Sequence, residues 1–331
     1  MKKKWLPMAL AVAAIALLGG GYLALEKLNS TEEEVEVVEV PMVSGEVDSI
    51  EYTLDTGNVS LVKDGDVWQW SQDAEFPLMQ DFPQAMASQG QTIDATSLVR
   101  SDGEELSTYG LDEPSKTIVL KSGEETVTCL IGDLNNYTGE YYMMLEGGKE
   151  IYTVSASFYS TFSYDLYDMI VMEQWPVTSV DDVRSVEYEG ADGTTLSLAA
   201  SENEDGTLSY QVNGSEADTT AAQDYIREFT YLTITECANY KASDDELSTY
   251  GLDAPAAVIQ IRWEESDEDG NTASDEITLT VGASDGNGGY YVRVGDSQAV
   301  NVMSGEELDW ILSPDASDFE PEADASSEAE S

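Results

Sequence analysis

A seven-residue segment that occurs twice constrains the fold of this chain more than any other feature. Leu-Ser-Thr-Tyr-Gly-Leu-Asp stands at 106–112 and again at 247–253, an offset of 141 residues. Each copy is preceded by Glu and followed, after one residue, by Pro114 or Pro255. This offset is far longer than the repeat period of a solenoid, which is about 20 to 50 residues. We therefore predict a tandem duplication of one domain-sized module.

Segments on both sides of the repeated motif also align. Val47–Tyr52 resembles Val183–Tyr188, and the Tyr141-Tyr142 pair reappears as Tyr290-Tyr291. Ile131-Gly132 precedes the first pair as Val281-Gly282 precedes the second. The predicted modules span residues 46–172 and 173–312.

Within each module, apolar runs alternate with Gly and Asp turns, which is typical of strands joined by hairpins. In the second module Thr219–Leu232 has apolar residues at helical spacing, and Asp81–Gln89 is a weaker helix in the first. Strands joined by short turns on both sides of one helix indicate antiparallel pairing. The predicted fold class is α+β: two tandem antiparallel-sheet modules with one main helix each, after an N-terminal transmembrane helix. The predicted strands of the first module are 50–54, 59–62, 67–70, 117–120, 126–131, 141–145 and 151–154, and those of the second after its motif are 258–263, 276–281, 290–294 and 299–302.

The repeated motif has a structural interpretation. A helical turn that ends at Tyr250, with Gly251 left-handed, brings Leu252 onto Leu247 in Schellman geometry. The first copy would place Leu111 on Leu106 in the same way, and a binding role for the tyrosines is the alternative. The predicted structural residues are Leu106, Tyr109, Gly110, Leu111, Asp112 and Pro114, with Leu247, Tyr250, Gly251, Leu252, Asp253 and Pro255.

The N-terminus has the pattern of a membrane anchor. Lys2, Lys3 and Lys4 precede an uncharged run at 5–25, and about 20 apolar residues span a bilayer as a helix. By the positive-inside rule the lysines stay in the cytoplasm and the bulk of the chain lies outside the membrane. We predict an anchor over 1–28; cleavage of this segment is the alternative. Residues 29–45 are expected to form an acidic stalk or an edge strand, and residues 313–331 a disordered acidic tail.

Composition excludes several classes of function. The 331 residues include 66 Asp or Glu, 14 Lys or Arg and no His, for a formal charge of −52. Such a chain is not expected to bind nucleic acid, whose phosphates attract Lys and Arg. Without His it has no Ser-His-Asp or Cys-His site and no His-containing metal site. The acidic loop 267–271 lacks the spacing of an EF-hand. Ser60 and Lys63 have the Ser-x-x-Lys spacing of penicillin-binding enzymes, but they lie on a predicted strand, where the two side chains face opposite sides. We therefore predict no catalytic residues, metal or cofactor.

Two further features leave alternatives open. Trp68 and Trp70 share one face of a predicted strand, where they belong to the core or form a binding surface for glycan or peptide. Cys129 and Cys237 would face an exterior in which a disulfide can persist, but they occupy different positions in the two modules. Cys129 alternates with apolar neighbours and is expected to be a buried thiol.

The order of motifs resembles the bacterial domain-of-unknown-function 4340 family. The resemblance rests on Tyr-Gly-Leu-Asp-x-Pro, a strand, an Ile-Gly-Asp turn and a Tyr-Tyr pair, and it covers residues 46–312. The second copy differs in having Ala283 in place of Asp133 and an acidic insertion at 264–275. The family has no known catalytic residues, its members are typically anchored in the cell envelope, and its genes often neighbour ABC-transporter components.

From these observations we expect a non-catalytic, single-pass membrane protein outside the cytoplasm. Its predicted role is an accessory or scaffold subunit of an envelope complex, such as an ABC transporter, with protein partners. The alternative is a module that binds wall glycan or peptide, and an exterior hydrolase is a third interpretation.

Overall fold

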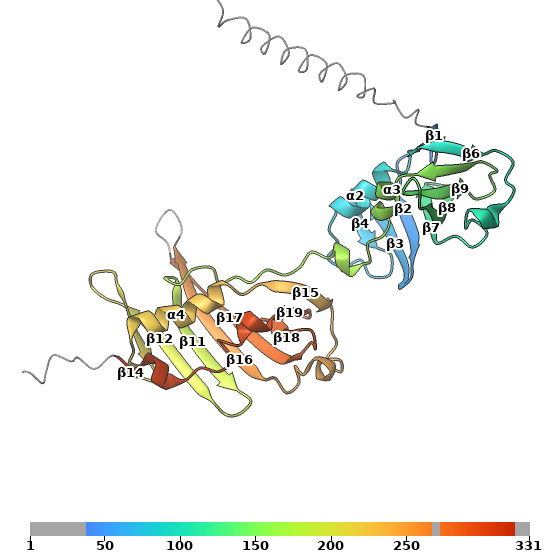
Figure 1. The fold of residues 1–331 in the computed structure, drawn as a ribbon. Coiled ribbons are helices and arrows are strands. Elements are labelled where there is room, and N and C mark those ends of the chain that lie inside the picture. The colour runs from blue at the N-terminus through green and yellow to red at the C-terminus, as the bar shows by residue number, and fades with distance from the viewer. Residues whose placement is uncertain (1–37, 267–271, 322–331) are drawn as a thin grey trace, which may run out of the picture. The chain divides into compact units, whose positions relative to one another are not determined.

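The computed structural model describes residues 38–266 and 272–321 (Figure 1). The chain divides into two compact units between Met169 and Ile170, here called module 1 and module 2. The predicted division, after residue 172, lies slightly later in the chain. The predicted anchor at 5–25 and the acidic loop 267–271 fall outside the described residues. Within the described ranges no helix is long and apolar enough to cross a membrane.

Module 1 contains an eight-stranded antiparallel sheet in the order β4-β3-β2-β7-β8-β9-β10-β6, and a separate two-stranded sheet, β1-β5. Its elements are β1 (Val38–Pro41), β2 (Ser49–Leu54), β3 (Gly57–Asp64), β4 (Val67–Trp70), α2 (Asp81–Ser88), β5 (Thr92–Ala95), β6 (Ser97–Arg100), η1 (Leu106–Thr108), β7 (Lys116–Ser122), β8 (Glu125–Asn135), β9 (Glu140–Leu145), β10 (Ile151–Val154), α3 (Ala156–Thr161) and η2 (Tyr167–Met169).

Module 2 contains a nine-stranded antiparallel sheet in the order β14-β13-β12-β11-β16-β17-β18-β19-β15. Its elements are β11 (Val183–Gly190), β12 (Thr195–Glu202), β13 (Leu208–Val212), β14 (Ser215–Glu216), α4 (Thr219–Thr230), β15 (Ile234–Asn239), η3 (Leu247–Tyr250), β16 (Ala257–Ser266), β17 (Thr272–Ser284), β18 (Gly289–Val294), β19 (Val300–Ser304), α5 (Gly305–Leu308) and η4 (Ala316–Phe319).

The two sheets have the same strand order. Each contains a meander of three strands, continues through a second meander of four strands (β7–β10 in module 1, β16–β19 in module 2), and ends with a strand from the segment after the main helix (β6 or β15). Module 2 adds only the short β14 at one edge. This common order is the expected outcome of a duplication, and the strands predicted from alternation all correspond to strands of the structure.

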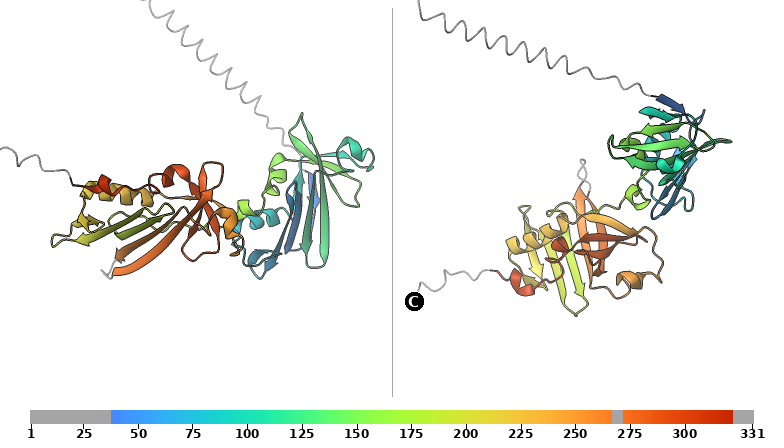
Figure 2. Two further views of the ribbon diagram at one scale, coloured as in Figure 1. Left: turned by 90° about the horizontal axis from the view of Figure 1, so that it is seen from below. Right: turned by 45° about the vertical axis from the view of Figure 1, so that its right-hand side comes forward.

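A helix lies on one face of each sheet (Figure 2). In module 2 the buried side of α4 consists of Ala222, Tyr225, Ile226 and Phe229, which join a large apolar core with the strands. In module 1 the shorter α2 buries Pro83 and Met86. Burial of one amphipathic face, rather than helix propensity, stabilises helices of this length.

The repeated motif makes a second, smaller core in each module. In module 2, Leu252 packs with Leu247, Tyr250 and Tyr291, and its backbone N–H donates to the Leu247 carbonyl at 3.0 Å. Gly251 has φ +68°, the left-handed conformation that a Schellman turn requires.

Module 1 repeats this arrangement. The N–H of Leu111 donates to the Leu106 carbonyl at 3.0 Å, and Gly110 has φ +67°. The rings of Tyr109 and Tyr142 meet edge to face with centres 4.8 Å apart, against 5.0 Å for Tyr250 and Tyr291. Both tyrosines of the motif therefore contribute to packing.

A glycine on the neighbouring strand allows the motif to approach the sheet. A Cβ at Gly132 would lie 2.0 Å from the carbonyl oxygen of Tyr109, and one at Gly282 would lie 2.2 Å from that of Tyr250. The backbone N–H of Asp133 donates to the same Tyr109 carbonyl at 2.8 Å. The Ile-Gly and Val-Gly dipeptides are thus part of the same structural unit as the motif.

Some predictions from the sequence need correction. Both modules consist mostly of antiparallel sheet with few helices, so α+β overstates the helical part. Residues 313–321 are not a disordered tail, because η4 packs onto module 2 through the buried Phe319. Of the two alternatives for 29–45, an acidic stalk or an edge strand, the described part is a strand: β1 pairs with β5 and contributes the buried Val40 to module 1. Module 1 therefore begins before residue 46.

Both cysteines are buried free thiols. Burial raises the pKa of Cys129 well above its usual range, and burial together with the nearby Glu173 carboxylate raises the pKa of Cys237 to about 11. Neither thiol is activated as a nucleophile, because a reactive cysteine has a lowered pKa.

Candidate functional site

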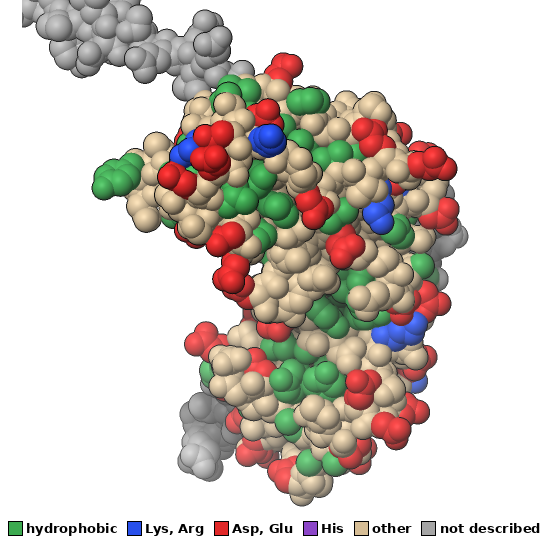
Figure 3. All heavy atoms as spheres, turned by 90° about the vertical axis from the view of Figure 1, so that its right-hand side faces the viewer, with side chains coloured by type: hydrophobic (Ala, Val, Ile, Leu, Met, Phe, Trp, Pro, Cys, Tyr) green, Lys and Arg blue, Asp and Glu red, His purple; other side chains and the backbone are tan. Residues whose placement is uncertain are grey.

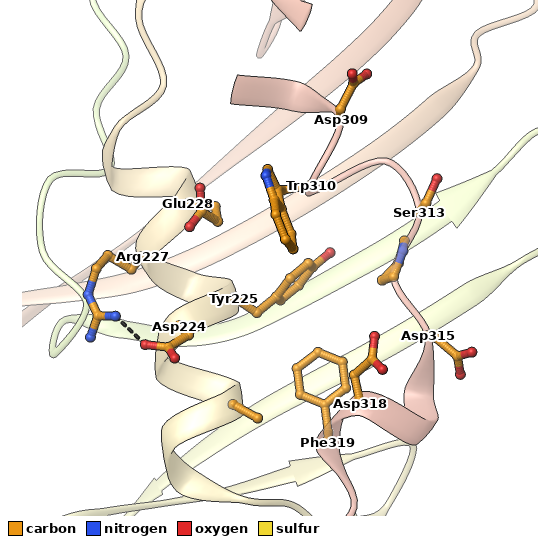
Figure 4. A pocket seen from close by; sticks show the side chains of 12 residues that line it. Asp224, Tyr225, Arg227, Glu228, Asp309, Trp310, Ser313, Asp315, Asp318 and Phe319 are labelled. Atoms are coloured by element: carbon orange, nitrogen blue, oxygen red, sulfur yellow. Dashed lines mark hydrogen bonds and ion pairs between the residues drawn. The ribbon is translucent and has the colours of Figure 1, made fainter. Parts of the chain in front are cut away.

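A groove on module 2, beside α4, brings together an exposed aromatic side chain and several carboxylates. It has a volume of about 750 Å³ and is open to solvent along its length (Figure 4). We call it the α4 groove. Its lining residues are Ala221, Asp224, Tyr225, Arg227, Glu228, Asp309, Trp310, Ser313, Pro314, Asp315, Asp318 and Phe319.

One wall of the α4 groove is the helix itself. The helix begins where the Asp218 side chain accepts a hydrogen bond from the Ala221 N–H at 2.9 Å, as an N-cap does. Because one side of α4 is buried against the sheet, Asp224, Arg227 and Glu228 remain on its outer part. Asp224 forms a salt bridge with Arg227 one turn later, and Figure 4 shows Arg227 pointing away from Trp310.

The opposite wall is the turn after α5, which exposes a tryptophan. Leu308 and Ile311 are fully buried in the core, and backbone hydrogen bonds from Ile311 and Leu312 to the Leu308 carbonyl close the turn. The two residues between these anchors, Asp309 and Trp310, must therefore point outward. Trp310 is 75% exposed, the largest exposure of any tryptophan in the described ranges.

Two aromatic residues form the floor of the α4 groove. The rings of Tyr225 and Phe319 meet edge to face with centres 5.5 Å apart. The Phe319 carbonyl accepts a hydrogen bond from the Asp218 N–H at 2.8 Å, which fixes η4 beside the start of α4. Figure 4 shows Trp310 and Glu228 projecting into the space above these two rings.

A buried tyrosine holds the wall that carries Trp310. The Tyr188 hydroxyl, on β11, donates to the Leu312 carbonyl at 2.6 Å. Module 1 has the same device, because the Tyr52 hydroxyl on β2 donates to the Tyr164 carbonyl at 2.7 Å. Burial raises the pKa of both hydroxyls, so both stay protonated donors at neutral pH.

The α4 groove is strongly acidic. It has five carboxylates and one guanidinium, and the guanidinium is paired with Asp224. Among the described residues no salt bridge involves Glu228, Asp309, Asp315 or Asp318. The Asp315 carboxylate accepts hydrogen bonds from the N–H and hydroxyl of Ser317, which lower its pKa. Glu228, Asp309 and Asp318 thus lie in the groove with the exposed indole and without a paired cation among the described residues, and Asp309 accepts one hydrogen bond, from the Tyr290 hydroxyl.

Module 1 has a smaller groove at the same place. In the strand register, Tyr141 pairs with Val154 in module 1, and Tyr290 pairs with Met303 in module 2. Equivalent residues in this part of the two modules are therefore 149 positions apart, so Thr161 is equivalent to Trp310. The module 1 groove has about 370 Å³ and is lined by Asp81, Phe82, Ala85, Ser157, Ser160, Thr161 and Tyr164.

The module 1 groove differs from the α4 groove in chemistry. Ser160 and Thr161 occupy the positions of Asp309 and Trp310. When the buried faces of α2 and α4 are aligned, Ala85 occupies the position of Glu228. The rings of Phe82 and Tyr164, with centres 4.7 Å apart, also fill part of the space. The acidic, tryptophan-bearing form of the groove is therefore specific to module 2.

The residues predicted as a binding surface lie elsewhere. Trp68 is 2% exposed, and its ring belongs to the interior of module 1, so it cannot contact a ligand. Trp70 is partly exposed and packs edge to face against Phe76 with ring centres 5.7 Å apart. Trp70, unlike Trp68, lines a pocket of about 250 Å³, together with residues of the β2–β3 turn and residues 165–167.

The residues of the repeated motif do not form the α4 groove. They pack between η1 or η3 and the sheet, with Asp112, Pro114, Asp253 and Pro255 in the turns that lead to β7 and β16. Trp310 was not predicted as a site residue, although the sequence contained a signal. Leu308 and Ile311 have the spacing of one buried helical face, and that spacing places Trp310 outside it.

Module 1 also contains a buried lysine without a counterpart in module 2. Lys116 is 2% exposed, and its ammonium group donates to the Phe162 carbonyl and the Ser163 hydroxyl, both at 2.6 Å. It also lies 3.9 Å from the centre of the Tyr159 ring. Burial lowers its pKa to about 8. Its hydrogen bonds lie at the C-terminal end of α3, where the helix dipole favours a cation, whereas burial disfavours the charged form.

Comparison with known proteins bears on the family alone. Searches of curated proteins and of solved structures give no match. The model of the family described as Domain of unknown function (DUF4340) matches residues 68–255 and 238–319, two overlapping regions consistent with two copies. The chain therefore belongs to the DUF4340 family, as the order of its motifs predicted.

Proposed function

We propose that this protein is a non-catalytic accessory or scaffold subunit of an envelope complex, such as an ABC transporter. In this proposal residues 5–25 anchor the chain in the membrane and modules 1 and 2 lie outside the cytoplasm. The α4 groove is the surface that docks the partner. The proposal extends beyond the family match, which carries no function.

Trp310 is the observation that carries the proposal. Burial of a largely exposed indole on a partner contributes about 2 kcal/mol or more, and tryptophan is enriched at the energetic centre of protein interfaces. The turn that presents it is fixed by buried Leu308 and Ile311 and by the Tyr188 hydrogen bond. Because the turn is already ordered, little backbone entropy is lost when its tryptophan is bound.

A glycan- or peptide-binding module is the second candidate. Its original basis was the pair Trp68 and Trp70, and the burial of Trp68 removes that platform. The α4 groove has one exposed aromatic ring and several carboxylates, so it would repel an anionic wall polymer. Peptide binding is compatible with the groove, and an exterior hydrolase is the third candidate function.

Affinity purification of the full-length protein from crosslinked, detergent-solubilised membranes tests the proposal. Trp310→Ser removes the indole, and Thr161→Ala changes the equivalent position of module 1 as a matched control. We expect one protein to co-purify in stoichiometric amounts with the wild type and Thr161→Ala, and to be lost with Trp310→Ser. A partnerless wild-type protein, or a partner that Trp310→Ser retains, would refute docking at this groove.

A further inference from the structure

We propose that the α4 groove accepts a cationic polypeptide segment, with a lysine or arginine side chain placed over the indole of Trp310. This inference rests on the proposed function and names the chemistry of the occupant. The groove and its exposed indole provide the binding surface, and the charges around the indole favour a cationic occupant.

The positions of the carboxylates fit a cation rather than an apolar segment. In Figure 4, Glu228 from α4 lies beside Trp310, Asp309 lies at the end of α5 just before Trp310 with its carboxylate pointing away from the indole, and Asp318 lies beside Phe319. The Tyr290 hydroxyl lies 3.5 Å from Asp309 Oδ1. A cation over an indole is attracted by the ring quadrupole, and nearby carboxylates add Coulomb attraction.

Charge also excludes several other occupants. Residues 322–331, which begin three residues after the end of η4, contain four acidic residues and no basic one, so this segment would be repelled. A second copy of the modules would meet the same obstacle, because acidic side chains are spread over the surface among few basic ones, as the face in Figure 3 shows. Phosphate-bearing polymers and acidic lipids are disfavoured for the same reason.

The duplication offers an internal comparison, because only module 2 has this property. The equivalent groove of module 1 has Ser160, Thr161 and Ala85 where module 2 has Asp309, Trp310 and Glu228. The scaffold around these positions is shared, including the tyrosine hydrogen bond that holds each wall. An indole and two carboxylates at three equivalent positions therefore distinguish one groove from the other without a change of fold.

The test uses full-length protein in detergent micelles and a fluorescent ten-residue peptide in which lysine alternates with serine. Matched peptides carry glutamine or glutamate in place of lysine. We expect saturable binding of the lysine peptide and none of the other two. Trp310→Ser should weaken binding by roughly 3- to 30-fold, the range of a cation–π contact. Glu228→Gln combined with Asp309→Asn should weaken it by up to roughly tenfold.

A charge-matched variant separates the groove from the general acidity of the surface. Glu202→Gln with Glu204→Gln removes two exposed carboxylates at the β12–β13 hairpin, away from the groove. This variant should change binding less than twofold. Equal losses in the two double variants, or no effect of Trp310→Ser, would overturn the inference.

Failure of this inference is distinguishable from failure of the proposed function. A protein that binds none of the peptides but loses its co-purifying partner in Trp310→Ser still docks that partner through the groove, by other chemistry. A protein that binds the lysine peptide at Trp310 but keeps its partner in Trp310→Ser uses the groove for a different cationic ligand. Far-UV circular dichroism should be unchanged in every variant, because the substituted side chains lie at the surface.

Discussion

Gly132→Ala should destabilise module 1 because it separates the repeated motif from the sheet. The new Cβ would lie 2.0 Å from the Tyr109 carbonyl oxygen, more than an ångström inside ordinary van der Waals contact at 3.4–4 Å. The neighbour is backbone, so it cannot rotate away as a side chain would. Relief requires the motif to move, which breaks the 2.8 Å hydrogen bond from the Asp133 N–H.

The magnitude follows from these two effects. Overpacking in a closely packed region costs about 1–3 kcal/mol, and the loss of one hydrogen bond costs about 0.5–1.5 kcal/mol. We expect the sum, a loss of about 1.5–4.5 kcal/mol, from the free energy of unfolding of module 1. With a urea dependence of about 2 kcal/mol per molar, the middle of the usual range, its midpoint should fall by roughly 1–2 M.

Hydrogen exchange read by mass spectrometry across a urea series measures this, because peptides from the two modules report separately. Gly132→Ala should shift the transition of module 1 alone. Gly282→Ala, whose Cβ would lie 2.2 Å from the Tyr250 carbonyl, should shift module 2 alone. Gly123→Ala is the control: Gly123 has φ +59° with no atom near its Cβ position, so only the left-handed strain of about 1–2 kcal/mol applies. A loss at Gly132 no larger than at Gly123 would refute the reasoning.

Three further predictions concern other buried groups. The pKa of Lys116 is about 8 in the folded state and 10.5 when unperturbed, so the stability linked to its neutral form is complete above pH 10.5 and is lost as the pH falls through 8. Between pH 7 and 10 the free energy of unfolding of the wild type, measured by urea titration, should rise by on the order of 2 kcal/mol relative to that of Lys116→Met. A difference between the two proteins that does not change with pH would contradict this. Tyr188→Phe removes one hydrogen bond, worth about 0.5–1.5 kcal/mol, and should raise amide exchange over 311–319 without affecting module 1, whereas Tyr52→Phe should leave 311–319 unchanged. Cys129 and Cys237 should react with a maleimide slowly in the native protein and rapidly in urea, and fast native labelling would show that their burial is not maintained.

The duplication made most of the sheet predictable from the sequence. The recurrence of Leu-Ser-Thr-Tyr-Gly-Leu-Asp set the two modules, and alternation located their strands because each strand has one face on a core. The left-handed glycine and the Leu252–Leu247 contact followed from local backbone geometry, which depends on a few neighbouring residues. These features are local, or repeated, and so are visible in one sequence.

The predictions failed where a distant contact decides the structure. Acidic composition suggested that the chain is disordered from residue 313, yet a single Phe319 packs on Tyr225 and orders η4. For Trp68 and Trp70, which share one strand face, the sequence left core packing and a binding surface open, because it does not tell whether that face is covered; the structure buries Trp68. The α4 groove joins α4 to the turn after α5, about 80 residues later in the chain, and only the folded sheet brings these segments together.

Site-specific photocrosslinking in cells tests the account's central claim, docking of a partner at Trp310, most directly. A photoreactive phenylalanine derivative would replace Trp310 in the full-length protein, with matched placements at Thr161 in module 1 and at Glu204 away from both grooves. The account predicts one discrete protein adduct from position 310, absent from the other two positions, with Lys or Arg residues at the crosslinked segment of the partner. No adduct at position 310, or the same set of adducts at all three positions, would contradict the account.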